Sequence, residues 1–294
     1  MVKMKFPSCF QQLLIVFACL LENLYCYRPL VLIHGINSDY KDLSDIEAWA
    51  QADFPGIQTF SLDAFNNDYS IVSMRTQVPE FVTLLKNITD HYGTVDLLGY
   101  SQGGIVARGV VEEGDNKNIN NFISLSAPGL GEYGIPFLND TSFFDHVTAG
   151  EVYHICYTKS GQLISVCNYW HDPIQTTLYL AENNYLPYLN NELAHNDSQR
   201  YKENFVSLGG LILVGGPTDE VIQPWQTAQY SFWDADLNVI PYNQLHYYTQ
   251  DTFGLKTLDD QGKLKFCTVS GVQHTKWPHT KSVYDTCIRP YIAN

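Results

Sequence analysis

Short continuous runs of apolar residues alternate along this chain with longer segments in which apolar residues recur every three or four positions. A continuous run is typical of a strand buried on both faces of a parallel sheet, whereas the longer spacing is typical of a helix. The runs that predict strands are residues 30–33, 57–62, 95–98, 122–126, 211–214 and 264–269. Strands that alternate with helices predict an α/β fold with a mostly parallel central sheet and helices on both faces.

Helical spacing is clearest from residue 74 to residue 91, where Val78, Phe81, Leu85 and Ile88 fall on one face. Gly93 follows as a C-terminal cap, because glycine tolerates the left-handed backbone that often ends a helix. Further helices are expected over residues 42–52, 104–111 and 282–291.

The alternation of strands and helices stops between about residues 130 and 205. This stretch is rich in Tyr, Asn, Asp and Pro, and the pattern resumes only at residues 211–214. We expect the stretch to form a cap inserted over the edge of the sheet. No linker divides the remainder, so residues 27–294 predict a single domain.

The first 26 residues resemble a secretory signal peptide. Lys3 and Lys5 precede a largely apolar stretch, Phe10 to Leu21, which is short for a membrane-spanning helix. Cleavage is expected between Ala18 and Tyr27, and an uncleaved anchor is the alternative. No later segment is apolar enough to span a bilayer, so a mature chain without a transmembrane anchor is expected.

The formal net charge of the 294 residues is −14, and 45% of them are hydrophobic. An acidic chain repels nucleic-acid phosphates, so a nucleic-acid partner is not expected. The sequence has no polybasic membrane patch and no C-x-x-C pair, so no metal site is favoured. It predicts no cofactor and carries no signal for an oligomeric state.

Cysteines and glycosylation sequons fit an oxidising compartment. Cys9, Cys19 and Cys26 fall in or at the end of the signal segment, and the remaining cysteines are Cys156, Cys167, Cys267 and Cys287. These can pair in three ways, of which the local pairing, Cys156 with Cys167 and Cys267 with Cys287, is the most economical. The sequons lie at Asn87, Asn139 and Asn196.

The segment Gly99-Tyr100-Ser101-Gln102-Gly103 lies between an apolar strand and a helix. This is the context of a G-x-S-x-G nucleophile elbow, a sharp turn that presents a serine hydroxyl and requires small flanking residues. Ser101 is therefore the candidate nucleophile of an α/β-hydrolase fold. A structural turn is the alternative reading.

A serine nucleophile needs a base and an acid that orients the base, and in α/β-hydrolases the chain order is Ser, acid, His. Asp219 follows the strand at residues 211–214 in a Gly/Pro-rich turn and is the candidate acid, with Glu220 as its competitor. His274 follows the last strand and is the candidate base, with His279 as the runner-up.

The tetrahedral intermediate of acyl transfer needs two positioned N–H donors for its oxyanion. The backbone N–H of Gln102, directly after the nucleophile, is one candidate. The other is the backbone N–H of Ile36, which follows His34-Gly35 on the loop after the first strand.

Several motifs resemble the palmitoyl-protein thioesterases of lysosomes, most closely the second branch of that family. They are Gly99 to Gly104, Phe122 to Pro128, Asn168-Tyr169-Trp170-His171-Asp172-Pro173, Gly215 to Asp219, Pro224-Trp225, Tyr248 to Lys256 and the spacing of the four late cysteines. The resemblance implies the same Ser101, Asp219 and His274, the same local disulfides, and an apolar groove in the cap for a long acyl chain. It also implies a cysteine pair around the elbow, where this chain has Gly99 and Ala107.

These features predict a serine hydrolase that cleaves long-chain fatty acyl thioesters, either palmitoyl-CoA or S-palmitoyl groups. The expected destination is the lysosome by the secretory pathway, with secretion as the alternative. Lys159, Lys276 and Lys281 are candidates for a basic rim that would receive an anionic head group. An oxygen-ester lipase and a catalytically silent binding protein on a hydrolase fold are the alternative functions.

Overall fold

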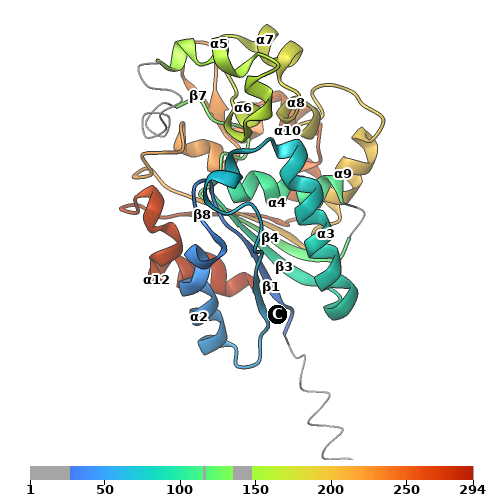
Figure 1. The fold of residues 1–294 in the computed structure, drawn as a ribbon, viewed down its shortest axis with the longest axis vertical. Coiled ribbons are helices and arrows are strands. Elements are labelled where there is room, and N and C mark those ends of the chain that lie inside the picture. Colours follow the sequence, from blue (N-terminus) through green and yellow to red (C-terminus); the bar gives the residue numbers. More distant parts are fainter. Residues whose placement is uncertain (1–26, 115–116, 135–147, 294) are drawn as a thin grey trace, which may run out of the picture.

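The computed structural model describes residues 27–114, 117–134 and 148–293, so the predicted signal peptide lies outside the described residues (Figure 1). Its centre is a six-stranded sheet with the order β2-β1-β3-β4-β5-β8, in which every neighbouring pair is parallel. The strands are β1 (Leu30–Ile33), β2 (Thr59–Ser61), β3 (Val95–Tyr100), β4 (Ile119–Leu125), β5 (Gly210–Gly215) and β8 (Leu264–Thr268). The predicted parallel sheet is confirmed, with the elbow strand β3 in its interior.

Helices cover both faces of the sheet. Successive side chains of a strand point to opposite faces, so each strand contributes to two separate buried clusters. In β1, Val31 and Ile33 belong to one buried cluster, while Leu30 and Leu32 belong to another. The first cluster includes residues of α3 (Met74–Tyr92), α4 (Gln102–Glu113) and α9 (Ser198–Val206). The second includes residues of α2 (Ser44–Asp53) and of the C-terminal helical segments. Figure 1 shows α2 and α12 across the sheet from α3.

The closing segment differs from the single helix expected over residues 282–291. It consists of α12 (Lys281–Val283), a π-helix (Tyr284–Ile288) and a 3-10 helix (Arg289–Tyr291). Pro290 has no N–H and therefore cannot continue a regular α-helix. The predicted helix at residues 42–52 also begins differently, with a 3-10 turn (Tyr40–Leu43) that precedes α2 and is capped by Asp39.

The stretch that the sequence assigns to a cap contains α5 (Tyr153–Cys156), α6 (Ser165–Tyr169), α7 (Thr176–Glu182) and α8 (Leu186–Leu189). The Cys156–Cys167 disulfide joins α5 to α6. These helices lie above the sheet at the top of Figure 1.

A second segment, between β5 and β8, packs against these helices. It holds the antiparallel strands β6 (Phe232–Trp233) and β7 (Val239–Ile240) and the helices α10 (His246–Thr249) and α11 (Leu255–Asp260). The His171 ring lies between the rings of Tyr179 and Phe232, with centroid distances of 4.3 Å to each. The sequence analysis missed this contribution, because strands of two residues leave no periodic pattern.

A fully buried arginine of α4 joins this helix to residues 129, 189 and 190. Arg108 of α4 donates to Gly129 O at 2.9 Å, to Asn190 Oδ1 at 2.8 Å and to Leu189 O at 3.1 Å. Its Nε pairs with Glu112 Oε1 at 2.7 Å, and its guanidinium lies 4.1 Å from the centre of the Phe253 ring. One charged side chain therefore joins α4, the loop after β4 and the end of α8.

Replacing Arg108 by methionine is expected to lower the free energy of unfolding by about 3–5 kcal/mol, because Glu112 would stay buried without its partner. The double variant Arg108→Met/Glu112→Leu should recover much of this loss. Urea denaturation measures both. The matched control is Lys86→Met, which breaks the exposed Lys86–Asp90 pair and should cost less than about 1 kcal/mol. A loss at Arg108 as small as this control would contradict the role of the arginine.

Candidate active site

Ser101 lies at the sharp turn between β3 and α4, with φ 54° and ψ −128°. A non-glycine residue with positive φ is uncommon and marks a turn whose surroundings hold it in place. A Cβ added at Gly99 would come 2.3 Å from Gly103 O, and one added at Gly103 would come 2.4 Å from His34 O. The flanks of the turn must therefore be small, and the backbone as it stands leaves no room for a cysteine at position 99.

The candidate residues Ser101, His274 and Asp219 meet in space, although Ser101 and His274 are 173 positions apart in the chain. His274 Nε2 lies 2.9 Å from Ser101 Oγ. His274 Nδ1 lies 2.9 Å from Asp219 Oδ2 and 3.1 Å from Asp219 Oδ1. The carboxylate accepts from Nδ1–H, which leaves Nε2 unprotonated and facing the serine hydroxyl. This arrangement can remove the Ser101 proton as the hydroxyl attacks a carbonyl carbon.

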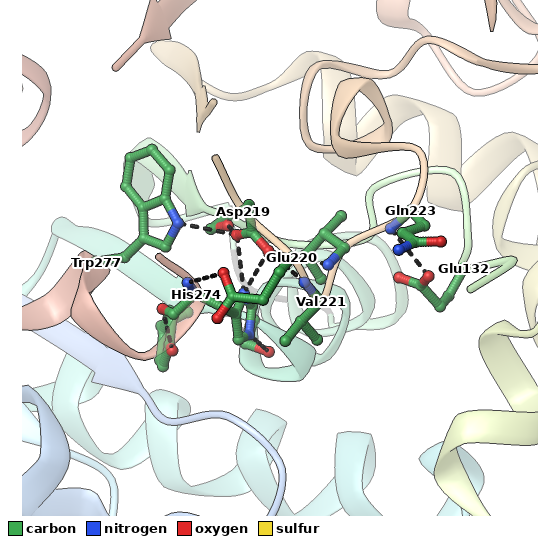
Figure 2. A network of polar contacts seen from close by, with 11 residues as sticks. Glu132, Asp219, Glu220, Val221, Gln223, His274 and Trp277 are labelled. Carbon is green, nitrogen blue, oxygen red and sulfur yellow. Dashed lines mark hydrogen bonds and ion pairs between the residues drawn. The ribbon is translucent and has the colours of Figure 1, made fainter. Parts of the chain in front are cut away.

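Asp219 receives several hydrogen bonds besides that from His274. The Ser126 hydroxyl and the Trp277 indole N–H, the latter at 2.9 Å, donate to Oδ2, and the backbone N–H groups of Val221 and Ile222 donate to Oδ1 at 3.0 Å each (Figure 2). Burial alone would raise the pKa of Asp219. The hydrogen bond and charge of His274, with the Ser126 hydroxyl, outweigh burial and hold this pKa below its usual value. The carboxylate therefore stays ionised beside the imidazole.

The competing candidates lie elsewhere. Glu220 Oε2 accepts the backbone N–H of His274 at 3.1 Å, so it supports the loop and does not reach the ring (Figure 2). His279 is exposed, with Nδ1 2.9 Å from Asp45 Oδ2 and Nε2 3.4 Å from Asp42 Oδ1.

Tyr100 is a supporting residue that the sequence analysis did not single out. Its hydroxyl donates to His274 O at 2.8 Å, and its ring stacks on the imidazole with centroids 5.4 Å apart. The sequence offers one signal for this role. Tyr100 comes directly before Ser101, so its side chain lies close to the residues that surround Ser101. Ser126 and Trp277 were missed for a different reason, since only the fold brings them to Asp219.

Ile36 and Gln102, the candidate oxyanion donors, line the same small pocket as Ser101. Gln102 is the first residue of α4, where backbone N–H groups have no acceptor within the helix. Its side chain donates to Ser70 O at 2.7 Å and accepts from the Tyr169 hydroxyl at 3.2 Å. These bonds hold the residue that follows the nucleophile.

The pocket at Ser101 has mainly apolar walls. It is lined by Ile36, Ser101, Gln102, Pro128, Glu132, Tyr169, Val221 and Ile222. A larger pocket of about 530 Å³ lies between α7 and the β6–β7 hairpin, with walls that include His171, Phe232 and Tyr247. No residue of the Ser101–His274–Asp219 set lines this second pocket, whereas Ser101 lines the smaller one.

The remaining candidates have mixed outcomes. The disulfides Cys156–Cys167 and Cys267–Cys287 are present, as the local pairing predicts. Asn87 and Asn196 are exposed, whereas Asn139 lies outside the described residues. Lys281 pairs with Asp285 and lies over the rings of Trp49 and Tyr284, so it faces the C-terminal segment and not the pocket.

Comparison with known proteins shows a family. The sequence profile described as palmitoyl protein thioesterase matches residues 29–274, a span that contains Ser101, Asp219 and His274. The chain belongs to the palmitoyl protein thioesterase family. Within the part of the chain that the structure describes, no helix is both long and apolar enough to cross a membrane.

Members of this family from several animals are similar over nearly the whole chain. Lysosomal thioesterase PPT2-B of Xenopus laevis is 35% identical over 283 residues, which cover 96% of this chain and 98% of that protein. Lysosomal thioesterase PPT2 of Mus musculus is 34% identical over 302 residues, with 99% and 98% covered. The PPT2 homolog of Drosophila melanogaster is 34% identical over 267 residues, with 90% and 92% covered.

The lowered pKa of Asp219 predicts a pH dependence of stability. The unfolded chain binds this proton near pH 3.8, whereas the folded chain binds it only at lower pH. The stabilisation is therefore fully present above the unfolded value and is lost as pH falls through the folded value. Urea denaturation of the wild type and Asp219→Asn across this range should show their stability difference shrinking as the pH falls. A constant difference would contradict the ionised state of Asp219.

Proposed function

We propose that this chain hydrolyses long-chain fatty acyl thioesters, palmitoyl-CoA or S-palmitoyl groups, through an acyl-enzyme on Ser101. The observation that carries the proposal is the continuous hydrogen-bonded set Ser101–His274–Asp219 at a strained turn, in a member of the palmitoyl protein thioesterase family. Ser101 is the nucleophile, His274 the general base and acid, and Asp219 the group that orients His274 and stabilises its protonated form.

In the first half-reaction, His274 Nε2 accepts the hydroxyl proton while Ser101 Oγ bonds to the thioester carbonyl carbon. The carbonyl oxygen becomes an oxyanion, to which the N–H groups of Ile36 and Gln102 donate. Removing one such donor typically costs about 2.7–4 kcal/mol in the barrier. The intermediate collapses, the carbon–sulfur bond breaks, and the thiolate takes the proton from His274.

In the second half-reaction, His274 accepts a proton from water while the water oxygen bonds to the acyl carbon. The new tetrahedral intermediate uses the same two N–H donors. It expels Ser101 Oγ, which regains its proton from His274, and the fatty acid leaves. One imidazole thus serves both steps in turn.

A thioester is a suitable substrate for an acidic compartment. A thiol has a pKa of about 8.5, so a thiolate leaves more readily than an alkoxide. The names of the relatives support a lysosomal destination for this chain. We also propose that residues 1–26 form the signal peptide that directs it there and that residues 27–294 form one domain with its cap.

The pocket walls indicate where the acyl chain begins. Ile36, Pro128, Val221 and Ile222 surround the space beside Ser101, and each is suited to contact methylene groups. Burial of an alkyl chain contributes about 0.8 kcal/mol per CH₂, so even a few contacts near the carbonyl favour an acyl group strongly. The rest of a long chain extends beyond this small pocket.

Ser101→Ala is expected to abolish turnover of a palmitoyl thioester, because Ser101 Oγ is the atom that forms the acyl-enzyme. A fluorophosphonate should add its mass to one peptide, the one that contains Ser101, as mass spectrometry can show. The matched control is Ser160→Ala, an exposed serine in the cap, which should keep full activity and labelling. An adduct on another residue would refute the assigned nucleophile.

The wild type should prefer a palmitoyl thioester over the palmitoyl oxygen ester of the matching alcohol. Side-by-side measurement of kcat/KM tests this, because the acyl group and the pocket stay the same while the leaving atom changes. A strong preference for the oxygen ester would favour a lipase. Pure protein that binds the thioester without turnover, although Ser101 is present, would favour a silent binding protein.

A further inference from the structure

Glu132 lies in the pocket of the nucleophile, yet the mechanism above does not use it. Its side chain lines the same small pocket as Ser101, Ile36 and Gln102, and the residue is only 3% exposed. Its backbone is fixed on both sides, since Glu132 N–H donates to Tyr169 O and Glu132 O accepts from His171 N–H, both at 2.9 Å. Figure 2 shows Glu132 with Gln223 at one end of the polar network and Trp277 at the other.

Within residues 27–114, 117–134 and 148–293, no positive charge compensates the carboxyl group of Glu132. Among the described residues, no Lys, Arg or His side chain forms an ion pair with it. The titratable groups that face it are Asp219, from the loop after β5, and Tyr169, from α6. Burial and the negative charge of Asp219 raise the pKa of Glu132 well above its usual value, although the backbone N–H groups of Gln223 and Tyr133 oppose them. Burial likewise raises the pKa of Tyr169, so both groups are neutral in acid.

The hydrogen bonds of Glu132 locate its proton. Oε1 accepts the Gln223 N–H at 2.9 Å and therefore acts as the carbonyl oxygen of the acid. The proton is then placed on Oε2, which accepts no hydrogen bond of ordinary geometry within the part of the chain that the structure describes, although the nearby Tyr133 N–H acts to lower the pKa of the acid. Glu132 lines the pocket beside Ser101, so a proton on Oε2 is within reach of a group bound in that pocket.

We propose that Glu132 is a substrate-contacting residue that works as a neutral carboxylic acid, and that ionisation of Glu132 switches off attack by Ser101. The inference rests on the proposed function, because it concerns the same pocket. The neutral acid donates a hydrogen bond from Oε2 to an acceptor atom of the bound thioester. The ionised acid has no proton to donate and adds a negative charge to the pocket in which the oxyanion must form.

The two charge states differ in their effect on the transition state. An oxyanion held by the Ile36 and Gln102 N–H groups gains from donors and loses from a nearby anion, and both effects are large where water is excluded. Glu132 must therefore be protonated, while His274 must be unprotonated at Nε2. A group that must lose its proton and one that must keep it give a bell-shaped pH dependence. Glu132 supplies the limb at high pH.

The experiment measures kcat/KM with the palmitoyl thioester of N-acetylcysteamine, which carries no ionisable group, from about pH 4 to about pH 8. The wild type should lose about tenfold per pH unit above the midpoint of the basic limb. Glu132→Gln cannot ionise but keeps a donor and an acceptor, so it should stay within about threefold of the wild type near pH 5 and lack the basic limb.

A second variant separates the hydrogen bond from the charge. Glu132→Leu also lacks the basic limb, but without a donor its kcat/KM near pH 5 should fall about tenfold below that of Glu132→Gln. Difference infrared spectra give a readout independent of turnover. A protonated carboxyl band should be absent from Glu132→Gln and should vanish in the wild type with the midpoint of the basic limb.

The control variant is Glu80→Gln, an exposed glutamate of α3, which should keep the wild-type profile. A Glu132→Gln enzyme that retains the basic limb would overturn the proposal, and so would a wild type without such a limb. Equal activity of Glu132→Gln and Glu132→Leu near pH 5 would overturn the hydrogen bond to substrate. Failure of the proposed function is distinguishable, because Ser101→Ala would then keep its turnover whatever the Glu132 variants do.

Discussion

The buried carboxylate of Asp219 is the interaction on which the rest of the site depends. It accepts hydrogen bonds from groups on three separate loops, namely Ser126 after β4, its own loop after β5, and His274 and Trp277 after β8. The carboxyl ends of parallel strands meet at one edge of a sheet, so a single anion there can gather all of these loops. The hydrogen bonds that orient the imidazole therefore also hold the loops after β4, β5 and β8 together.

Glu132, a second buried carboxyl group, has a pKa that is shifted in the opposite direction from that of Asp219. Asp219 accepts hydrogen bonds from several donors, including His274, and its pKa is lowered. Burial and the nearby charge of Asp219 raise the pKa of Glu132, although the backbone N–H groups of Gln223 and Tyr133 oppose them. When their surroundings give two carboxyl groups different pKa values, one type of functional group can fill two different roles. Residue type alone does not distinguish the two, because the pKa of each carboxyl group depends on its burial, its hydrogen-bond donors and the charges nearby.

The sequence predicts the parts of this protein whose signals are local. The apolar runs of β1, β3 and β5 place the sheet, and the Gly99–Gly103 segment places Ser101, the candidate nucleophile, because a strained turn restricts which residues can flank it. The acid and base follow from chain order along a known type of fold. Glu132 and the β6–β7 segment were missed, since their importance arises from contacts between distant segments that leave no periodicity. The closing helix was misjudged where Pro290 interrupts it.

The Arg108 contacts have a consequence for how the protein unfolds. If the segment that contains α8 were free to move, it could unfold first and leave the contacts among Ser101, His274 and Asp219 intact. The buried guanidinium of Arg108 joins α4, the loop after β4 and the end of α8. If any of these segments moved away, the buried charge would lose hydrogen-bond partners. Such segments open together as a single cooperative unit. Loss of the Arg108 contacts would therefore loosen the helix that follows Ser101 together with the loop after β4 and the end of α8.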